Sequence, residues 1–310
     1  MPESFVNQAT GRCSVQGSKY WFNCNPDGPY HWFKINWINK STGYLGKEKT
    51  AKVRAEAAAK GLEAGLKNIL HVHFTMDDNL SLSEEIKARY RSMYTGVFFK
   101  RYILGLWAMA EGIIYDMFDA DKHVQKITDF FRCLKDGGRY VSCDYGTQNA
   151  TVFLLWNKGN NGKWYCVREY YYSGRAKGKQ KTDGEYADDF EKWLDGVPIR
   201  AVIVDPAAAS FIAELRKRGY RVLKADNDVE DGIREVASML NMGLLVFCDT
   251  CINTIMEFGS YIWDEKAAQQ GEDRPVKEND HAMDAVRYFV YTILSKRTGR
   301  VKNKAKYGFD

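Results

Sequence analysis

The sequence predicts an α/β protein in which helices flank a mixed β-sheet, and two observations carry this prediction. Three β-rich segments follow one another between residues 140 and 172, and Asn161-Gly162, a strong signal for a two-residue hairpin turn, separates the last two. Strand-like and helical segments then alternate from residue 183 to residue 248, as they do in parallel βαβ units. An antiparallel meander that continues into βαβ units forms one mixed sheet with helices on both faces.

The N-terminal third is expected to combine short strands and helices. Residues 20–24 are a strand candidate that the aromatic segment 31–38 continues, and residues 69–75 are another short strand candidate. Residues 47–66 are rich in Ala, Lys and Glu, a composition that favours helix. Ser81 and Glu84 have the spacing of a capping box, so a helix is expected to begin there. Residues 102–109 are a further helix candidate.

The remaining two thirds contain the strands of the sheet and the helices that cover it. Apolar, β-rich runs predict strands at residues 140–144, 151–156, 164–172, 201–205, 221–224 and 244–248. Periodic apolar residues predict helices at residues 183–194, 207–218 and 229–240. A further helical stretch follows around residues 280–288.

The composition is that of an ordinary globular protein. Apolar residues make up 45% and charged residues 27% of the 310 residues. This length suffices for one large domain or two small ones. The chain has no run of about 18 apolar residues and no charged-then-apolar N-terminus, so we expect neither a membrane span nor a signal peptide. The protein is therefore expected to stay in the cytosol.

The cysteines and histidines indicate neither a disulfide framework nor a zinc site. Seven cysteines, an odd number at irregular spacing, favour reduced thiols. Cys248 and Cys251 form a lone CxxC pair at an expected strand-to-helix turn, and we attribute the pair to packing. His71 and His73 alternate in one strand candidate without a third ligand nearby, so we interpret them as structural.

Three aspartates form the candidate catalytic site. Asp144 and Asp205 each end a strand candidate, so their side chains would lie side by side if the two strands are neighbours. Asp284, on a later helix, would close the site. Carboxylate oxygens suit Mg²⁺ or Mn²⁺, and two such ions support in-line phosphodiester hydrolysis. Asp280 shares a helix face with Asp284 and is either an acid behind the metal ligands or the helix N-cap, which we favour.

The formal net charge is +5, and the basic residues are clustered. One cluster comprises Arg175, Lys177, Lys179 and Lys181. Two others lie at residues 216–218 and 296–306. Each cluster alone is typical of a solvated surface. Beside an acidic metal site, the clusters favour binding to the phosphates of DNA, with an affinity that falls as salt rises. We expect the first cluster and the hairpin turn at residues 161–162 to hold the duplex.

The motifs, taken in order, resemble the ribonuclease H-like nuclease fold. They are a strand that ends in Asp-x-Gly at Asp144, a hairpin, a strand that ends in Asp-Pro at Asp205, and a terminal helix with Asp284. Residues 277–288 resemble the end of the nuclease domain of tailed-phage terminase large subunits. The resemblance implies that these aspartates bind two Mg²⁺ or Mn²⁺ ions. It also matches His281 to the family's histidine one helical turn before the last carboxylate.

The resemblance implies a DNA endonuclease that cuts concatemeric viral DNA during genome packaging. Its implied partners are double-stranded DNA, the terminase small subunit and the portal of the procapsid, in the cytoplasm of an infected or lysogenic bacterial host. We expect Asp144 to bridge both ions, Asp205 and Asp284 to hold one each, and His281 to orient the scissile phosphate or relay a proton. The alternatives are a junction-resolving nuclease or transposase of the same fold, and a non-catalytic remnant that only binds DNA or terminase partners.

The N-terminal part resembles a piece of a terminase ATPase. Residues 1–5 and 23–32 resemble the portion that follows the Walker B acid, with Asn23, Asn25 and Pro26 in the motif that couples hydrolysis to movement. The resemblance implies an ATPase remnant at residues 1–79, a helical linker at 80–118 and a nuclease domain at 119–310.

A phosphate-binding loop is missing from this ATPase remnant. Residues 41–48 approach its pattern but lack the first glycine and place Glu48 where a hydroxyl is needed. We therefore expect no ATPase activity from this chain alone. A natural truncation, a split gene and an artificially chosen boundary would each explain this.

Overall fold

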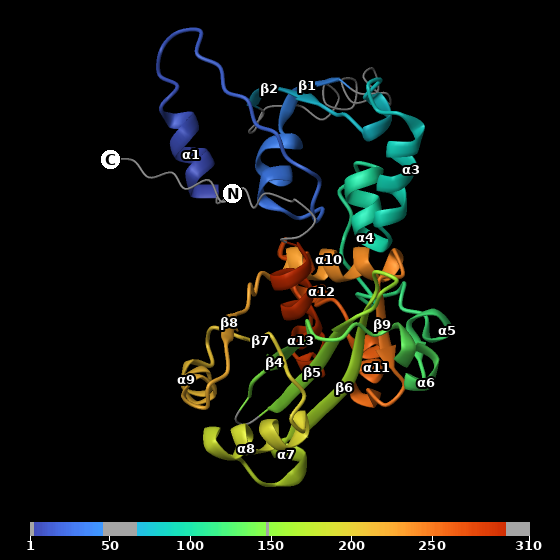
Figure 1. Cartoon of the computed structure of the whole chain (residues 1–310). Helices are drawn as coiled ribbons and strands as arrows, with labels where there is room; N and C mark the ends of the chain where they lie inside the picture. Colours follow the sequence, from blue (N-terminus) through green and yellow to red (C-terminus); the bar gives the residue numbers. More distant parts are fainter. Residues whose placement is uncertain (1–2, 46–66, 147–148, 296–310) are drawn as a thin grey trace. The chain divides into compact units, whose positions relative to one another are not determined.

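The chain forms two compact units (Figure 1), Met1–Gly112 with Trp263–Arg274 and Ile113–Ile262 with Pro275–Asp310. The computed structural model describes residues 3–45, 67–146 and 149–295. The three-part division expected at residues 79/80 and 118/119 stays a prediction. No helix within the described ranges is long and apolar enough to cross a membrane.

The first unit is built from short elements and a parallel strand pair. β1 (Ser41–Leu45) pairs with β2 (Lys67–Val72), so the strand expected at residues 69–75 is present but begins and ends earlier. The helical segments of this unit are α1 (Glu3–Gly11), η1 (Lys34–Ile38), η2 (Met76–Asp78), α3 (Glu84–Met93), α4 (Gly96–Phe98), η3 (Phe99–Ile103) and α12 (Glu265–Gln269). The helix expected at residues 47–66 lies outside the described residues.

The prediction of extended structure in the aromatic N-terminal segments is wrong. Residues 20–24 form no strand, and residues 34–38 are helical. The rings pack on one another instead of lining a strand ladder: Tyr20 and Phe22 contact Trp37 at ring-centroid distances of 5.9 and 5.8 Å. Aromatic residues favour strands only where a neighbouring strand offers partners, and this aromatic cluster takes their place.

The prediction of a helix at residues 102–109 is also wrong. Residues 102–109 leave the helical conformation after Ile103. Gly105 has a φ of +67°, and a Cβ on it would lie 2.5 Å from the His73 ring, so the chain turns here at a position that only glycine fits. By contrast, α3 is present, but its N-cap is Ser83 and not the expected Ser81: the Ser83 side chain accepts the N–H of Ile86.

The second unit contains the expected mixed sheet, with strand order β3-β9-β6-β5-β4-β7-β8. The antiparallel neighbours are β4 with β5 and β5 with β6, and the other neighbours are parallel. The strands are β3 (Val124–Gln125), β4 (Tyr140–Asp144), β5 (Ala150–Lys158), β6 (Trp164–Ser173), β7 (Ala201–Val204), β8 (Val222–Lys224) and β9 (Leu245–Cys248). The meander followed by βαβ units is therefore confirmed.

Helices cover both faces of this sheet, and those expected at residues 183–194, 207–218 and 229–240 are present within two residues at each end. The helical segments are α5 (Ala120–His123), α6 (Ile127–Phe130), η4 (Phe131–Cys133), α7 (Gly174–Lys177), α8 (Asp183–Leu194), α9 (Ala209–Lys217), α10 (Val229–Asn241), α11 (Ile252–Ser260), α13 (His281–Phe289) and η5 (Val290–Leu294). Alternate residues of β4 serve opposite faces. Val141 and Cys143 join the core formed with Phe190 of α8 and Phe211 of α9.

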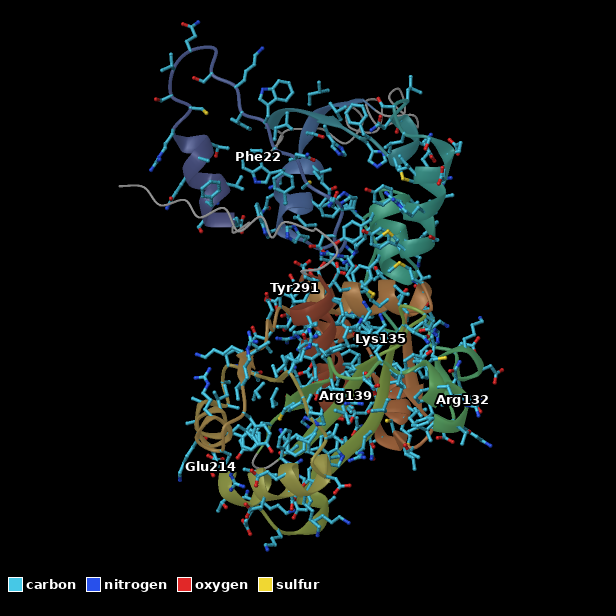
Figure 2. The ribbon with its side chains drawn as sticks, viewed as in Figure 1. Phe22, Arg132, Lys135, Arg139, Glu214 and Tyr291 are labelled. Carbon is cyan, nitrogen blue, oxygen red and sulfur yellow. The ribbon has the colours of Figure 1, made fainter. Side chains whose placement is uncertain are left out.

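The other face of the sheet packs against α13. Phe289 of α13 stacks on Trp156 of β5 with ring centroids 4.4 Å apart. The Trp156 indole donates to the Ser142 hydroxyl at 2.9 Å, which satisfies a buried N–H inside this layer. Beyond α13, the Tyr291 hydroxyl of η5 donates to Asp231 of α10 at 3.1 Å. Tyr291 is labelled in Figure 2. The terminal helix is therefore fixed to the sheet on one side and to α10 on the other.

Strand register determines which loops share an edge. β4 and β7 are parallel and pair Cys143 with Val204, so Asp144 and Asp205 leave neighbouring strands at one edge. We call it the carboxylate edge. The last residue of β6 pairs with the first residue of β5, so α7 begins at the carboxylate edge too. The turn at residues 161–162 lies at the opposite edge, where β4 begins, and its expected contact with DNA stays a prediction.

All seven cysteines are free thiols, as expected. Cys248 ends β9 and Cys251 precedes α11, so the CxxC pair spans a strand-to-helix turn. Both thiols are buried, which agrees with a packing role.

Candidate active site

Two strand ends supply the first carboxylates of the site. The other residues of β4 are buried, and Asp144 ends the strand with a side chain that is 14% exposed. Asp205 follows β7 directly, and its Oδ1 accepts the N–H of Ala207 at 2.8 Å in the turn toward α9. The two aspartates are thus fixed by the sheet and by a tight turn.

Helix α13 supplies one polar stripe along this edge. His281, Asp284 and Tyr288 are spaced by three and four residues and therefore share a helix face. His281 Nδ1 lies 2.9 Å from Oδ2 of Asp144. The Tyr288 hydroxyl donates to Oδ2 of Asp205 at 2.7 Å. The helix therefore contacts both strand-end carboxylates and carries Asp284 between the two contacts.

Asp284 is surrounded by positive charge. Arg287, which is buried, donates from Nη2 to Oδ1 of Asp284 at 2.9 Å. Lys277 Nζ lies 3.6 Å from Oδ2 of Asp284 and 3.2 Å from Oδ2 of Asp280. These cations lower the repulsion among carboxylates that are buried close together.

Each of the three predicted metal ligands is thus hydrogen-bonded to a donor from α13. Within the described ranges, no three His, Cys, Asp or Glu side chains are arranged so as to hold a metal ion. The carboxylates gather at one edge, but their oxygens face protein donors and not one another. Their assignment as metal ligands stays a prediction.

Burial changes the proton affinity of the central pair. Burial raises the pKa of Asp144 to about 6, the hydrogen bond from His281 opposes this rise, and the charge of Asp284 adds to it. For His281, burial disfavours the charged ring, but the bond and charge of Asp144 raise its pKa above the ordinary value. The protonation of Asp144 and that of His281 are therefore coupled.

All three carboxylates raise the pKa of the Tyr288 hydroxyl. Its pKa is raised mainly by burial, then by the charges of Asp284 and Asp144, and further by its hydrogen bond to Asp205. The phenol therefore stays neutral and acts as a hydrogen-bond donor. These couplings place Asp144, Asp205 and Asp284 in one electrostatic cluster.

The N-cap role favoured for Asp280 is only half right. Asp280 does stand at the N-cap position of α13, but its side chain makes no capping hydrogen bond. It is buried, pairs with Lys277 and lies 4.0 Å from His281 Nδ1. The N–H groups of Ala282 and Met283 are capped instead by Glu257 of α11.

The basic cluster of residues 175–181 follows β6 at the carboxylate edge. Lys179 and Lys181 pair with Glu185 and Asp189 of α8, so much of their charge is already neutralised. Arg175 and Lys177 are exposed and make no ion pair within the described part of the chain.

The other two basic clusters offer less to a nucleic acid. Arg218 binds the carboxylates of Asp188, Glu191 and Glu214, which gives it a structural role. Residues 296–306 lie outside the described residues.

Comparisons with known proteins agree with this architecture. The large terminase of a thermophilic bacteriophage is 55% identical in sequence, has a TM-score of 0.80, and matches over 95% of this chain and 68% of its own. This chain belongs to the large terminase family. A model of the terminase RNaseH-like domain matches residues 143–292, from the end of β4 through α13 into η5.

Other large terminase structures and sequences extend the comparison. The same thermophilic-phage terminase has also been solved in complex with ADP, with a TM-score of 0.81 over 95% of this chain and 67% of its own. The large subunit of Escherichia phage T5 is 26% identical over 250 residues, 77% of this chain and 55% of that protein. The chain thus spans about half the length of this curated relative.

Membership in the large terminase family confirms the expected ribonuclease H-like mixed sheet, and the second unit is a terminase nuclease-type domain. It also argues against the junction-resolving and transposase alternatives.

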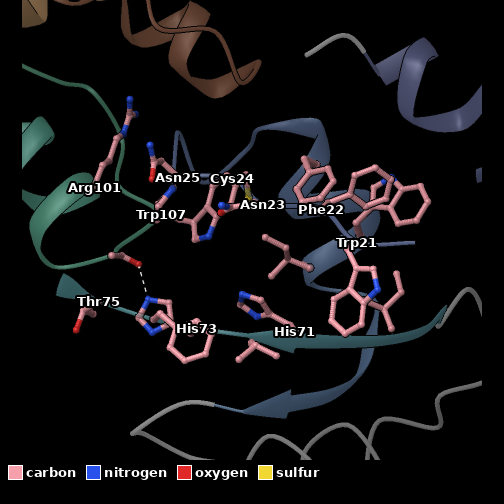
Figure 3. Close-up of a pocket in the computed structure, with 18 of the residues that line it drawn as sticks. Trp21, Phe22, Asn23, Cys24, Asn25, His71, His73, Thr75, Arg101 and Trp107 are labelled. Carbon is pink, nitrogen blue, oxygen red and sulfur yellow. Dashed lines mark hydrogen bonds between the residues drawn. The ribbon is translucent and has the colours of Figure 1, made fainter. Parts of the chain in front are cut away.

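In the first unit, the predicted ATPase-coupling residues Asn23, Asn25 and Pro26 line a cavity of about 720 Å³ (Figure 3). His71 and His73 line the same cavity from β2, and His73 bonds to the Gly105 carbonyl at 2.9 Å.

Several side chains around the three carboxylates were not predicted from the sequence. Tyr288 and Arg287 follow Asp284 by four and three residues, so helical spacing was a usable signal for them. Lys277 also lies in the recognised terminal motif. Glu257 gave no local signal, because it reaches the site from a different helix.

Proposed function

We propose that this chain is the nuclease part of a phage large terminase and cuts concatemeric viral DNA during packaging by metal-dependent phosphodiester hydrolysis. The polar stripe on α13 supports this most, because it gathers Asp284 with the strand-end carboxylates Asp144 and Asp205. Membership in the large terminase family supports the same function.

The donor set suits Mg²⁺ or Mn²⁺. Asp144, Asp205 and Asp284 offer carboxylate oxygens, the hard ligands that these ions prefer. We assign Asp144 to both of two ions, and Asp205 and Asp284 to one ion each. When bound, the ions supply an activated hydroxide and stabilise the leaving oxygen.

Other residues of the chain hold these three carboxylates in place. His281 holds Oδ2 of Asp144 through a hydrogen bond at Nδ1. Tyr288, a neutral donor, holds Oδ2 of Asp205. Arg287 and Lys277 stabilise the charge of Asp284. We assign His281 to orienting the scissile phosphate or relaying a proton, because it is the titratable base bonded to the central carboxylate.

Double-stranded DNA is the proposed substrate, and Arg175 and Lys177 are its proposed phosphate contacts beside the site. Lys179 and Lys181 complete that basic loop. By analogy with large terminases, the small subunit and the portal of the procapsid are the proposed partners. Asn23, Asn25 and Pro26 are proposed to belong to the motif that couples ATP hydrolysis to movement in large terminases.

A digestion of supercoiled plasmid tests this proposal. The purified chain is incubated with plasmid in Mn²⁺, in Mg²⁺ and in EDTA, and Mn²⁺ binding is measured separately by calorimetry. We expect nicked and linear DNA with either ion and intact plasmid in EDTA. Intact plasmid in all three, from a folded protein that still binds DNA, would instead identify a non-catalytic DNA-binding remnant.

A further inference from the structure

The first turn of α13 is capped by a residue from another helix. A helix leaves its first N–H groups without partners inside the helix, and the N-cap side chain usually supplies one. Asp280 occupies the N-cap position without doing so. Oε2 of Glu257, on α11, accepts the N–H groups of Ala282 and Met283 at 2.7 and 3.2 Å.

The Glu257 carboxylate is itself held in place. Its Oε1 accepts the hydroxyl of Tyr171, on β6, at 2.9 Å. The Glu257 residue is 4% exposed, so water competes little for these bonds. Three donors from two elements therefore fix this carboxylate, and through it the start of α13 is fixed relative to β6 and α11.

This arrangement leaves Asp280 available to the active site. A capping Asp280 would turn its carboxylate back onto the first N–H groups of the helix. Its carboxylate instead lies 3.2 Å from Lys277 Nζ and 4.0 Å from His281 Nδ1, and its charge contributes to the raised pKa of Asp144. The residue after it, His281, is the one that contacts Asp144.

We infer that Glu257 is a positioning residue of the nuclease: as a remote cap it fixes the first turn of α13, sets His281 and Asp284 against Asp144, and leaves Asp280 facing the carboxylates. The inference rests on the proposed nuclease function. Neighbours that orient metal ligands typically change metal affinity or activity by about 10–100-fold when they are altered.

Stability alone gives little reason for a charged residue here. Burying a carboxylate costs free energy even when it is hydrogen-bonded, and a neutral residue of the same shape is often as stable. The capping bonds need an oxygen at this distance, whereas the negative charge is not needed for them. The inference therefore predicts that the length of the side chain matters more than its charge.

Two variants separate length from charge. Glu257→Gln keeps the length and one oxygen for the two N–H groups, and we expect a kcat for plasmid cleavage within about threefold of wild type. Glu257→Asp keeps the charge but is one methylene shorter, and we expect its kcat to fall about tenfold or more, with an unchanged KM for DNA and weaker Mn²⁺ binding by calorimetry. The reverse order of the two variants would overturn the inference, and so would wild-type kcat and Mn²⁺ affinity in Glu257→Asp.

A matched control is available in the same layer. Glu169 of β6 caps α11: its Oε1 accepts the N–H group of Asn253 at 3.1 Å and its Oε2 accepts that of Thr254 at 2.6 Å. Glu169→Asp should lower the melting temperature but leave kcat and Mn²⁺ affinity per folded molecule unchanged. If it lowers both as much as Glu257→Asp does, the effect is general loosening, and the inference fails.

The outcomes also separate this inference from the proposed function. If wild type cuts no DNA, the nuclease proposal fails, while Mn²⁺ calorimetry on the same variants still tests the positioning role. If Glu257→Asp does not fold, Tyr171→Phe removes one of the three donors to Glu257. A several-fold loss of kcat and Mn²⁺ affinity in Tyr171→Phe then supports the inference, and no loss overturns it.

Discussion

Asp144 is the residue on which the proposed chemistry depends most, because it ends a central strand and bonds to His281. Asp144→Asn keeps the volume and loses the charge that would bind metal. We expect cleavage to fall more than about a hundredfold, beyond the loss seen for supporting residues, with little change in melting temperature. Plasmid digestion and a thermal melt measure the two effects.

A strand-end aspartate elsewhere in the sheet controls for this change. Asp249 directly follows β9 and is exposed. Asp249→Asn should cut at the wild-type rate. A folded Asp144→Asn variant that also cuts at that rate would remove Asp144 from the mechanism.

Glu257 should make stability depend on pH. Burial raises its pKa from 4.5 to about 7, although the bond from Tyr171 and the two backbone N–H groups oppose this. Between these values the unfolded chain has lost a proton that the folded chain still holds, so this residue lowers stability as pH rises from about 4.5 through about 7. Glu257→Gln lacks this dependence.

Urea unfolding of wild type and Glu257→Gln at pH 5 and pH 8 measures the effect. The stability difference should shift in favour of the variant at pH 8. The charge of Glu257 also raises the pKa of His281, so the measured shift includes the effect of the substitution on that histidine. An equal difference at both pH values would show that the pKa of Glu257 is not raised in the folded protein.

Among the elements, α13 combines two tasks. Most of its residues are buried, and Phe289 anchors it to the sheet. Its polar stripe reaches Asp144 and Asp205 on two strands. Because the same helix carries core contacts and site residues, small shifts of its first turn change the site without unfolding the protein.

The short element α7 is where DNA contacts can be tested. Replacing both Arg175 and Lys177 by Ala removes two exposed cations at the carboxylate edge. We expect KM to rise with kcat unchanged, and the slope of log affinity against log salt to fall by about 2. Fluorescence anisotropy with duplex DNA over a salt series measures the slope.

The control for α7 is a cation at the far end of α8. Lys192 is exposed and lies in the last turn of that helix. Lys192→Ala should leave the salt slope unchanged. An unchanged slope in the α7 variant as well would place the DNA contacts elsewhere.

For the whole molecule, we predict DNA cleavage without ATP and no ATP hydrolysis by this chain. Phosphoryl transfer from ATP needs a phosphate-cradling loop with its Lys and a Mg²⁺-holding acid, and residues 41–48 do not match that pattern. Of these residues, 41–45 form β1. The proposed carboxylate site needs only metal, water and a phosphodiester.

Plasmid digestion with and without ATP, beside a phosphate-release measurement, tests this prediction. Equal cutting in both reactions and no phosphate release are the expected results. DNA-stimulated ATP turnover by the purified chain would contradict the prediction, and so would cleavage that strictly requires ATP.

Sequence patterns predicted the second unit far better than the first. The strands and helices between residues 140 and 248 have strong period-2 and period-3.6 patterns, and the structure has them in the expected order. In the first unit, residues 20–24 and 31–38 are aromatic enough to favour strands. Their rings cluster around Trp37 instead, and no local pattern encodes that choice.

Local sequence patterns were enough to specify the mixed sheet, the strand-end positions of Asp144 and Asp205, and the helix that carries Asp284. Each follows from the spacing of apolar residues along a strand or helix, which can be read from a few consecutive residues. Tertiary packing was needed to bring His281 to Asp144, 137 residues away, and to make Glu257 cap α13 in place of Asp280. Such contacts depend on how sheet and helices pack, because a buried polar group takes whichever partner the fold brings within reach.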